Sequence, residues 1–113
     1  MTLLVFICNN PEKLEETLEG FLEVGVTGAT IIDSLGMGHI LATDVPIFAG
    51  FQSLFSAASA YNKTVFSVIE ENSKVDDALD MIEEICGKLG DPGVGIAFTI
   101  SLDKVRGLMP ELE

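Results

Sequence analysis

Apolar residues recur along this chain with two different spacings, one typical of strands and one typical of helices. Continuous or alternating apolar runs without proline predict four strands, at residues 2–8, 29–35, 64–70 and 94–101. Apolar residues spaced three and four apart, with acidic residues between them, predict two amphipathic helices, at residues 12–24 and 74–89.

Local signals mark where these elements begin and end. Asn10, Pro11 and Glu12 are typical of a helix start, as a cap, a first-turn proline and an acid at the positive end of the helix dipole. Gly25 suits the left-handed conformation that ends a helix. Gly90-Asp91-Pro92-Gly93 predicts a tight turn before the last strand.

The resulting order, strand–helix–strand–strand–helix–strand, is the βαββαβ pattern of ferredoxin-like α+β folds. Right-handed crossovers then give an antiparallel four-stranded sheet of order 4-1-3-2, with both helices on one face. Residues 2–8 are nevertheless apolar on both faces, with Leu3, Val5 and Ile7 on one and Leu4, Phe6 and Cys8 on the other. We therefore expect a second copy of the chain to cover the face without helices.

The connection at residues 39–62 is unusually long and apolar. Asp44 and Pro46 predict the start of a helix over about residues 47–59, with a face that includes Phe51 and Leu54. Connections of this length are commonly functional. The sequence leaves open whether this helix packs on its own domain or forms a docking surface for a partner protein.

Two glycine-rich turns, Gly36–Gly38 and Gly93–Gly95, offer main-chain N–H groups to a ligand. In the predicted topology both lie at the same end of the sheet but on opposite edges. A cyclic assembly that places the second strand of one subunit against the fourth strand of the next would bring the two turns together. We therefore expect a small-molecule cleft at each subunit boundary.

Composition narrows the class of protein further. Eighteen acidic and six basic residues give a formal charge of −12, which disfavours nucleic acid and anionic membrane surfaces as partners. No apolar run is long enough to cross a membrane, and the N-terminus lacks the features of a signal peptide. A single domain over residues 1–113 is expected, in the cytoplasm, with Cys8 and Cys86 as buried free thiols.

Two segments resemble the PII (nitrogen regulatory) signal-transduction proteins. GVTGATIIDSLGMG, residues 25–38, is similar to the stretch from their first helix to the base of the T-loop, and GDPGVGIAFTISLDKV, residues 90–105, to their B-loop and fourth strand. The resemblance implies a ferredoxin-like homotrimer that binds an adenine nucleotide (ATP, ADP or AMP) between subunits. It also implies a T-loop-like insertion at residues 37–62, which acts on a partner protein through residues 39–62. Independently of the resemblance, we expect a loose tail at residues 108–113.

Carried over position by position, the resemblance implies ligand-binding roles in three groups of residues. They are Gly28, Ala29, Thr30 and Val68 near the base and sugar, Gly36, Met37 and Gly38 at the T-loop base, and Gly93, Val94 and Gly95 near the phosphates. The basic positions of the family are not kept: Ile96 replaces its lysine, and its tail arginines fall on Gly107 and Met109. We therefore expect ATP to bind no better than AMP.

Two other interpretations remain open. The chain could be a trimeric interaction module without a ligand, or a metal-binding trimer resembling the CutA proteins. His39 is the only histidine, and no cluster of His, Cys and carboxylates has the spacing of a metal site. No nucleophile lies beside a base, so catalytic residues are not expected and the chain is not interpreted as an enzyme.

Overall fold

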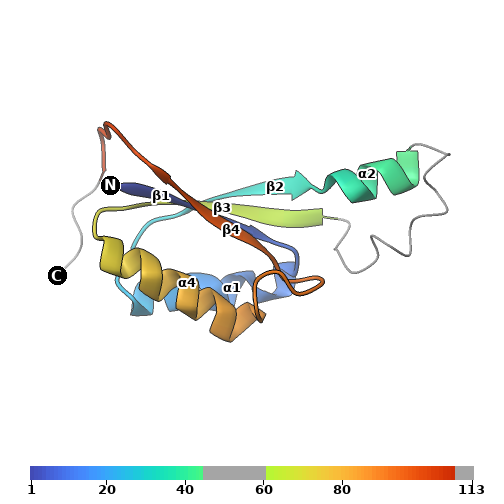
Figure 1. Cartoon of the computed structure of the whole chain (residues 1–113), viewed down its shortest axis with the longest axis horizontal. Helices are drawn as coiled ribbons and strands as arrows, with labels where there is room; N and C mark the ends of the chain where they lie inside the picture. The colour runs from blue at the N-terminus through green and yellow to red at the C-terminus, as the bar shows by residue number, and fades with distance from the viewer. Residues whose placement is uncertain (45–60, 109–113) are drawn as a thin grey trace.

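A four-stranded antiparallel sheet lies at the centre of the computed structural model, which describes residues 1–44 and 61–108 (Figure 1). Its elements are β1 (Thr2–Cys8), the 3-10 turn η1 (Pro11–Lys13), α1 (Leu14–Glu23), β2 (Thr30–Leu35), α2 (Met37–Asp44), β3 (Tyr61–Ile69), α4 (Asn72–Cys86) and β4 (Gly95–Ser101). The strand order is β2-β3-β1-β4, which is the predicted order read from the other edge. The βαββαβ fold is therefore confirmed.

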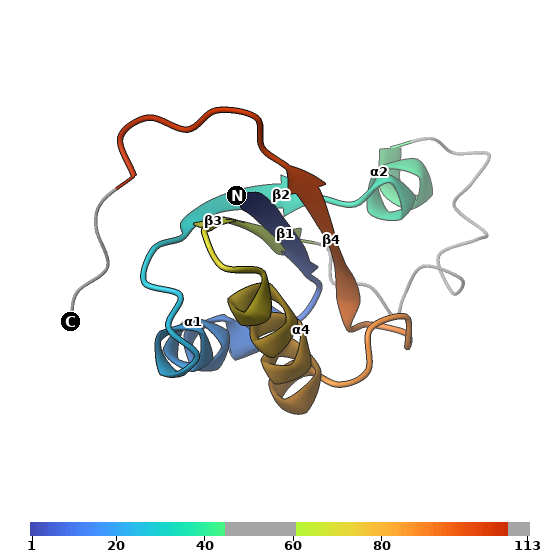
Figure 2. The same ribbon diagram turned by 60° about the vertical axis from the view of Figure 1, so that its left-hand side comes forward.

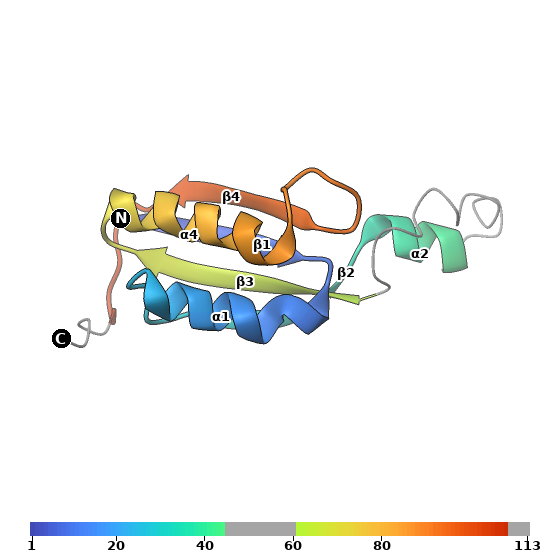
Figure 3. The same cartoon turned by 90° about the horizontal axis from the view of Figure 1, so that it is seen from below.

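Helices α1 and α4 pack on the same face of the sheet, as Figures 2 and 3 show. The side chains that fill the space between the sheet and the helices are almost all apolar. They are Leu4, Phe6, Cys8, Phe21, Val26, Val65, Ile69, Val75, Ala78, Met81 and Ile82. Each buried Leu, Ile, Phe or Met stabilises the fold by roughly 1.5–3 kcal/mol, so this layer supplies most of the driving force for folding.

Gly25 ends α1 as the sequence predicts. Its φ is +88°, its N–H donates to the Leu22 carbonyl at 3.1 Å, and the Val26 N–H donates to the Phe21 carbonyl at 2.8 Å. These two bonds form a Schellman motif, which satisfies carbonyls that the end of a helix leaves open. Because Phe21 and Val26 are both buried, the motif also fixes the direction in which the chain leaves for β2.

Several boundaries differ from the expectation. Asn10 makes no side-chain cap, because a 3-10 turn precedes α1 and the Asn10 carbonyl instead accepts the Lys13 N–H at 3.0 Å. β3 begins at Tyr61 rather than at residue 64, because Tyr61, Asn62 and Lys63 pair with the end of β2. α4 spans Asn72–Cys86 instead of residues 74–89 and ends at Gly87, whose φ is +104°.

The segment after β2 is the largest correction. Gly36–Gly38 was expected to be an open turn, but α2 begins at Met37 and its first turn closes with the Ile40 N–H on the Gly36 carbonyl at 3.2 Å. Neither glycine has a positive φ, so the helix can pass through Gly38 without strain. The predicted helix at residues 47–59 and the tail at residues 109–113 lie outside the described residues. Among the described residues, no helix has the length and apolarity to span a membrane.

The two cysteines are neighbours, although they are far apart in the sequence. The buried Cys8 thiol donates to the Asn10 carbonyl at 3.1 Å, and the half-buried Cys86 sulfur lies 3.3 Å from the Thr17 hydroxyl. The Thr17 hydroxyl already donates to the Lys13 carbonyl at 2.8 Å, so Cys86 is the donor to Thr17. Both thiols are free, as predicted.

The Cys8 thiol makes the stability of the fold depend on pH. Burial is the main cause that raises the pKa of Cys8 above its ordinary value of 9.0; the Asn10 hydrogen bond opposes the rise and the Cys86 thiol adds to it. The folded state therefore holds this proton after the unfolded chain has released it, and stability falls as the pH rises above 9. We expect the free energy of unfolding, measured with urea, to fall more steeply between pH 8 and about pH 11 for the wild type than for Cys8→Ala. Parallel curves for the two proteins would show that Cys8 does not contribute.

Gly95 is required where β4 begins. Its φ is +140°, and a Cβ there would lie 2.1 Å from the Ile7 carbonyl oxygen on β1. Gly95→Ala combines a strained backbone with a clash against main chain, and we expect it to lower the free energy of unfolding by about 3 kcal/mol or more. Gly90→Ala is the matched control, because Gly90 also has a positive φ but open space around it; we expect a cost of about 1 kcal/mol. Equal urea midpoints for the two variants would contradict this assignment.

Candidate functional site

No described helix packs on the face of the sheet opposite α1 and α4 (Figure 2). In an antiparallel ladder, directly opposed residues lie on the same face. The register therefore places on this open face Leu3, Val5, Ile7, Thr30, Ile32, Ser34, Asn62, Thr64, Phe66, Val68, Ile96, Phe98 and Ile100. Ile96, Phe98 and Ile100 on β4 are 55%, 42% and 48% exposed. An uncovered sheet face is ordinarily polar, so this face has the composition of an interface.

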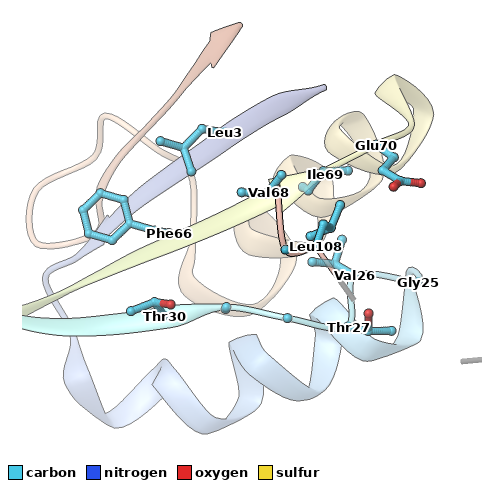
Figure 4. A pocket seen from close by; sticks show the side chains of 13 residues that line it. Leu3, Gly25, Val26, Thr27, Thr30, Phe66, Val68, Ile69, Glu70 and Leu108 are labelled. Atoms are coloured by element: carbon cyan, nitrogen blue, oxygen red, sulfur yellow. The ribbon is translucent and has the colours of Figure 1, made fainter. Parts of the chain in front are cut away.

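A pocket of about 390 Å³ lies at the end of the sheet that contains the N-terminus (Figure 4). Its floor is formed by Leu3, Phe66 and Val68 from the open face, and one wall is the segment from Gly25 to Thr30, which connects α1 to β2. Leu108, from the segment after β4, adds an apolar side chain to the pocket. Four residues that the sequence predicts as ligand contacts, Gly28, Ala29, Thr30 and Val68, therefore lie together around one cavity.

The pocket exists because β2 and β3 separate at this end. Their ladder begins at the Thr30–Phe66 pair, yet β3 continues to Ile69. Residues 27–29 run beside the last part of β3 without ladder bonds, and the buried Ser67 hydroxyl bridges to the Gly28 carbonyl at 2.6 Å. The Ser67 hydroxyl thus holds residues 27–29 beside β3 and satisfies the Gly28 carbonyl. Other main-chain groups of residues 27–29 have no ladder partner and stay available to a ligand.

The other predicted ligand residues lie at the opposite end of the sheet. Gly36, Met37 and Gly38 follow β2, and Gly93, Val94 and Gly95 lead into β4. As predicted, these two segments are at the same end but on opposite edges, because β2 and β4 are the outer strands. A single chain does not bring either segment together with the pocket residues.

A polar cluster occupies the open face near the start of α2. The Ser34 hydroxyl contacts the Thr64 hydroxyl at 2.7 Å and the Asn62 side-chain carbonyl, and the Asn62 amide donates to the Asn9 side chain at 3.3 Å. Asn62 is buried, and its side-chain contacts join β3 to Ser34 on β2 and to Asn9, the residue that follows β1. The cluster holds together the strand ends from which α2 projects.

Charged side chains of both signs lie near these regions, and the Lys74 ammonium group lies beside Gly25 at the pocket wall. Among the described residues that line the pocket, Glu70 is the only one with an ionisable side chain. Lys63 pairs with Asp33 across β2 and β3, whereas Lys104 and Arg106 belong to an exposed segment that borders a separate, shallow depression with Met1 and Leu102. Ile96, which takes the place of a basic residue in the PII resemblance, is an exposed member of the open face.

Sequence reasoning did not identify Leu3, Phe66, Glu70 and Leu108 as pocket residues. The strand pattern contained the necessary signal for Phe66, because it alternates with Val68 on the same face. The place where β2 leaves β3, and the return of Leu108 to this end of the sheet, have no comparable signal in the sequence.

Comparison with known proteins adds no identification. No protein-family model matches the chain, and no curated protein matches it. Within the described residues, no group of three or more His, Cys, Asp or Glu side chains is arranged to hold a metal ion.

Proposed function

We propose that this chain is the subunit of a PII-like cyclic trimer that senses a small ligand and acts on a partner protein. The observation that carries the proposal is the apolar open face, which extends over β1, β3 and β4. Burying Ile96, Phe98 and Ile100 against other copies would remove from water side chains that each contribute roughly 1.5–3 kcal/mol. The threefold number and the regulatory role come from the resemblance to PII proteins.

The pocket supports ligand sensing by this assembly. Gly28, Ala29, Thr30 and Val68 were assigned to the base and sugar of an adenine nucleotide from the resemblance alone, and they line the same cavity. In a cyclic trimer, the β2 edge of one subunit can meet the β4 edge of the next. That arrangement would bring Gly36–Gly38 to Gly93–Gly95 at each boundary, which accounts for the predicted residues outside the pocket.

The connection between β2 and β3 supports action on a partner. α2 projects beyond the end of the sheet, at the opposite end of the molecule from the N-terminus (Figure 1). Residues 45–60, VPIFAGFQSLFSAASA, contain no charged residue, although the chain has a formal charge of −12. An uncharged segment that begins at this projecting position is suited to contact an apolar surface on another protein.

The assembly can be tested with a charge placed on the open face. We expect light scattering at micromolar concentration to give about three times the chain mass, and Phe98→Glu to give the mass of one chain, because a buried unpaired carboxylate is strongly unfavourable. Leu22→Glu is the matched control: Leu22 is 62% exposed on α1, outside the open face, and should leave the mass unchanged. A wild-type monomer would refute the assembly, and a dimer would refute its PII-like symmetry.

Ligand sensing can be tested by thermal unfolding with a panel of adenosine, AMP, ADP, ATP, bicarbonate, 2-oxoglutarate and divalent metals. A ligand that binds only the folded state raises the midpoint by mass action. We expect the adenine compounds to raise it. A response to metals alone would instead support the CutA-like interpretation, and the absence of any response would support an interaction module without a ligand.

A further inference from the structure

Two cysteine side chains from distant parts of the sequence meet at one end of the core. Cys8 is the last residue of β1, and Cys86 is the last residue of α4. Their thiols lie within hydrogen-bonding range of each other, and both side chains belong to the same apolar cluster. Close packing of α4 on α1 is possible because Gly20 has no side chain, and a Cβ there would overlap the Met81 sulfur. The fold therefore holds two free thiols side by side.

The two thiols differ in how easily a molecule in solution can reach them. Cys8 is fully buried, and its thiol donates to the Asn10 carbonyl at 3.1 Å. Cys86 is only half-buried, and its sulfur lies 3.3 Å from the Thr17 hydroxyl. Neither is a member of the open face, because Cys8 packs in the helix-covered core and Cys86 belongs to α4. The proposed assembly through the open face therefore leaves Cys86 accessible.

The residues around the pair connect it to the segment between α4 and β4. Gly87 follows Cys86 directly, and the Val94 side chain lies 3.4 Å from the position of a Cβ on Gly87. The Val94 carbonyl accepts the N–H of Asn9, the residue after Cys8, at 3.2 Å. Both ends of residues 87–94 therefore lie beside the end of β1, next to the two thiols.

We propose that Cys8 and Cys86 form an oxidative modification site, at which a hydroperoxide converts the two thiols into a disulfide within one chain. The disulfide ties the end of α4 to the end of β1 and closes residues 87–94 at their base. Disulfides of cytosolic proteins are usually transient and respond to the redox state of the cell. The inference is separate from the proposed function, because the ligand pocket lies at the other end of the sheet.

The reaction takes two steps, and Cys86 reacts first because it is the more accessible thiol. With hydrogen peroxide, the Cys86 thiolate attacks one oxygen: an S–O bond forms, the O–O bond breaks, and the leaving hydroxide becomes water with the proton that Cys86 released. The Cys8 sulfur then loses its proton and attacks the Cys86 sulfur. The S–S bond forms, the S–O bond breaks, and the second hydroxide becomes water with the Cys8 proton. The two sulfurs together lose the two electrons that reduce the peroxide.

Peptide mapping of the folded wild type after treatment with hydrogen peroxide tests the site. We expect the chain to lose the mass of two hydrogen atoms, and cleavage after lysine and arginine to give one cross-linked product that contains residues 1–13 and 75–88. Dithiothreitol should restore both thiols. Because the disulfide closes a long loop in the unfolded chain, the thermal midpoint should rise by about 5 °C. Retention of both thiols, oxidation of Cys86 to a sulfinic acid without a cross-link, disulfides only between chains, or an unraised midpoint would overturn the proposal.

Two serine variants and an unfolded control test the roles of the two thiols. In Cys8→Ser the sulfenic acid on Cys86 has no partner, so dimedone should label Cys86, whereas it should not label the wild type. In Cys86→Ser the buried Cys8 thiol should be oxidised at least about tenfold more slowly than the thiols of the wild type. Unfolding in urea separates the thiols and should slow formation of the disulfide within the chain several-fold. Equal rates for the folded and unfolded chains, or rapid oxidation of Cys8 in Cys86→Ser, would contradict the proposed site.

Discussion

The structure depends on β1, which is hydrogen-bonded to β3 on one side and to β4 on the other. Because it is the inner strand and apolar on both faces, it contributes Leu4, Phe6 and Cys8 to the helix-covered core and Leu3, Val5 and Ile7 to the open face. The core alone accounts for only half of these side chains. Val5 is already buried within the single chain, whereas Leu3 and Ile7 are only half-buried and would be covered further by another copy, which supports the proposed assembly.

The fold could be predicted from the sequence because several independent signals agree. The β1 range, the end of α1 at Gly25 and the strand order are all as expected. The errors are concentrated where local pattern and tertiary pairing compete. Tyr61–Lys63 have no strong strand pattern and become part of β3 through pairing with β2, while Gly36–Gly38 look like a turn but begin a helix.

The candidate site could be predicted only in part. Gly28, Ala29, Thr30 and Val68 were found through resemblance, and the structure places them around one pocket. The charge environment of that pocket depends on Glu70, which lines it, and on Lys74, whose ammonium group lies beside Gly25, and neither position can be predicted without the geometry. Similarly, the sequence shows two isolated cysteines, whereas the fold makes neighbours of Cys8 and Cys86 by placing the end of α4 over the end of β1.

The position of β2 determines how far the pocket lies from α2. The strand begins at the pocket with Thr30 and ends at Leu35, two positions before the first residue of α2. It is roughly 20 Å long at about 3.3 Å per residue. As an edge strand it is held in the sheet by β3 only. Because Gly36 is the only residue between β2 and α2, the strand borders the pocket at one end and leads directly into the projecting helix at the other. The separation of the pocket from the projecting connection is therefore set by the length of one strand that is paired along all of its residues.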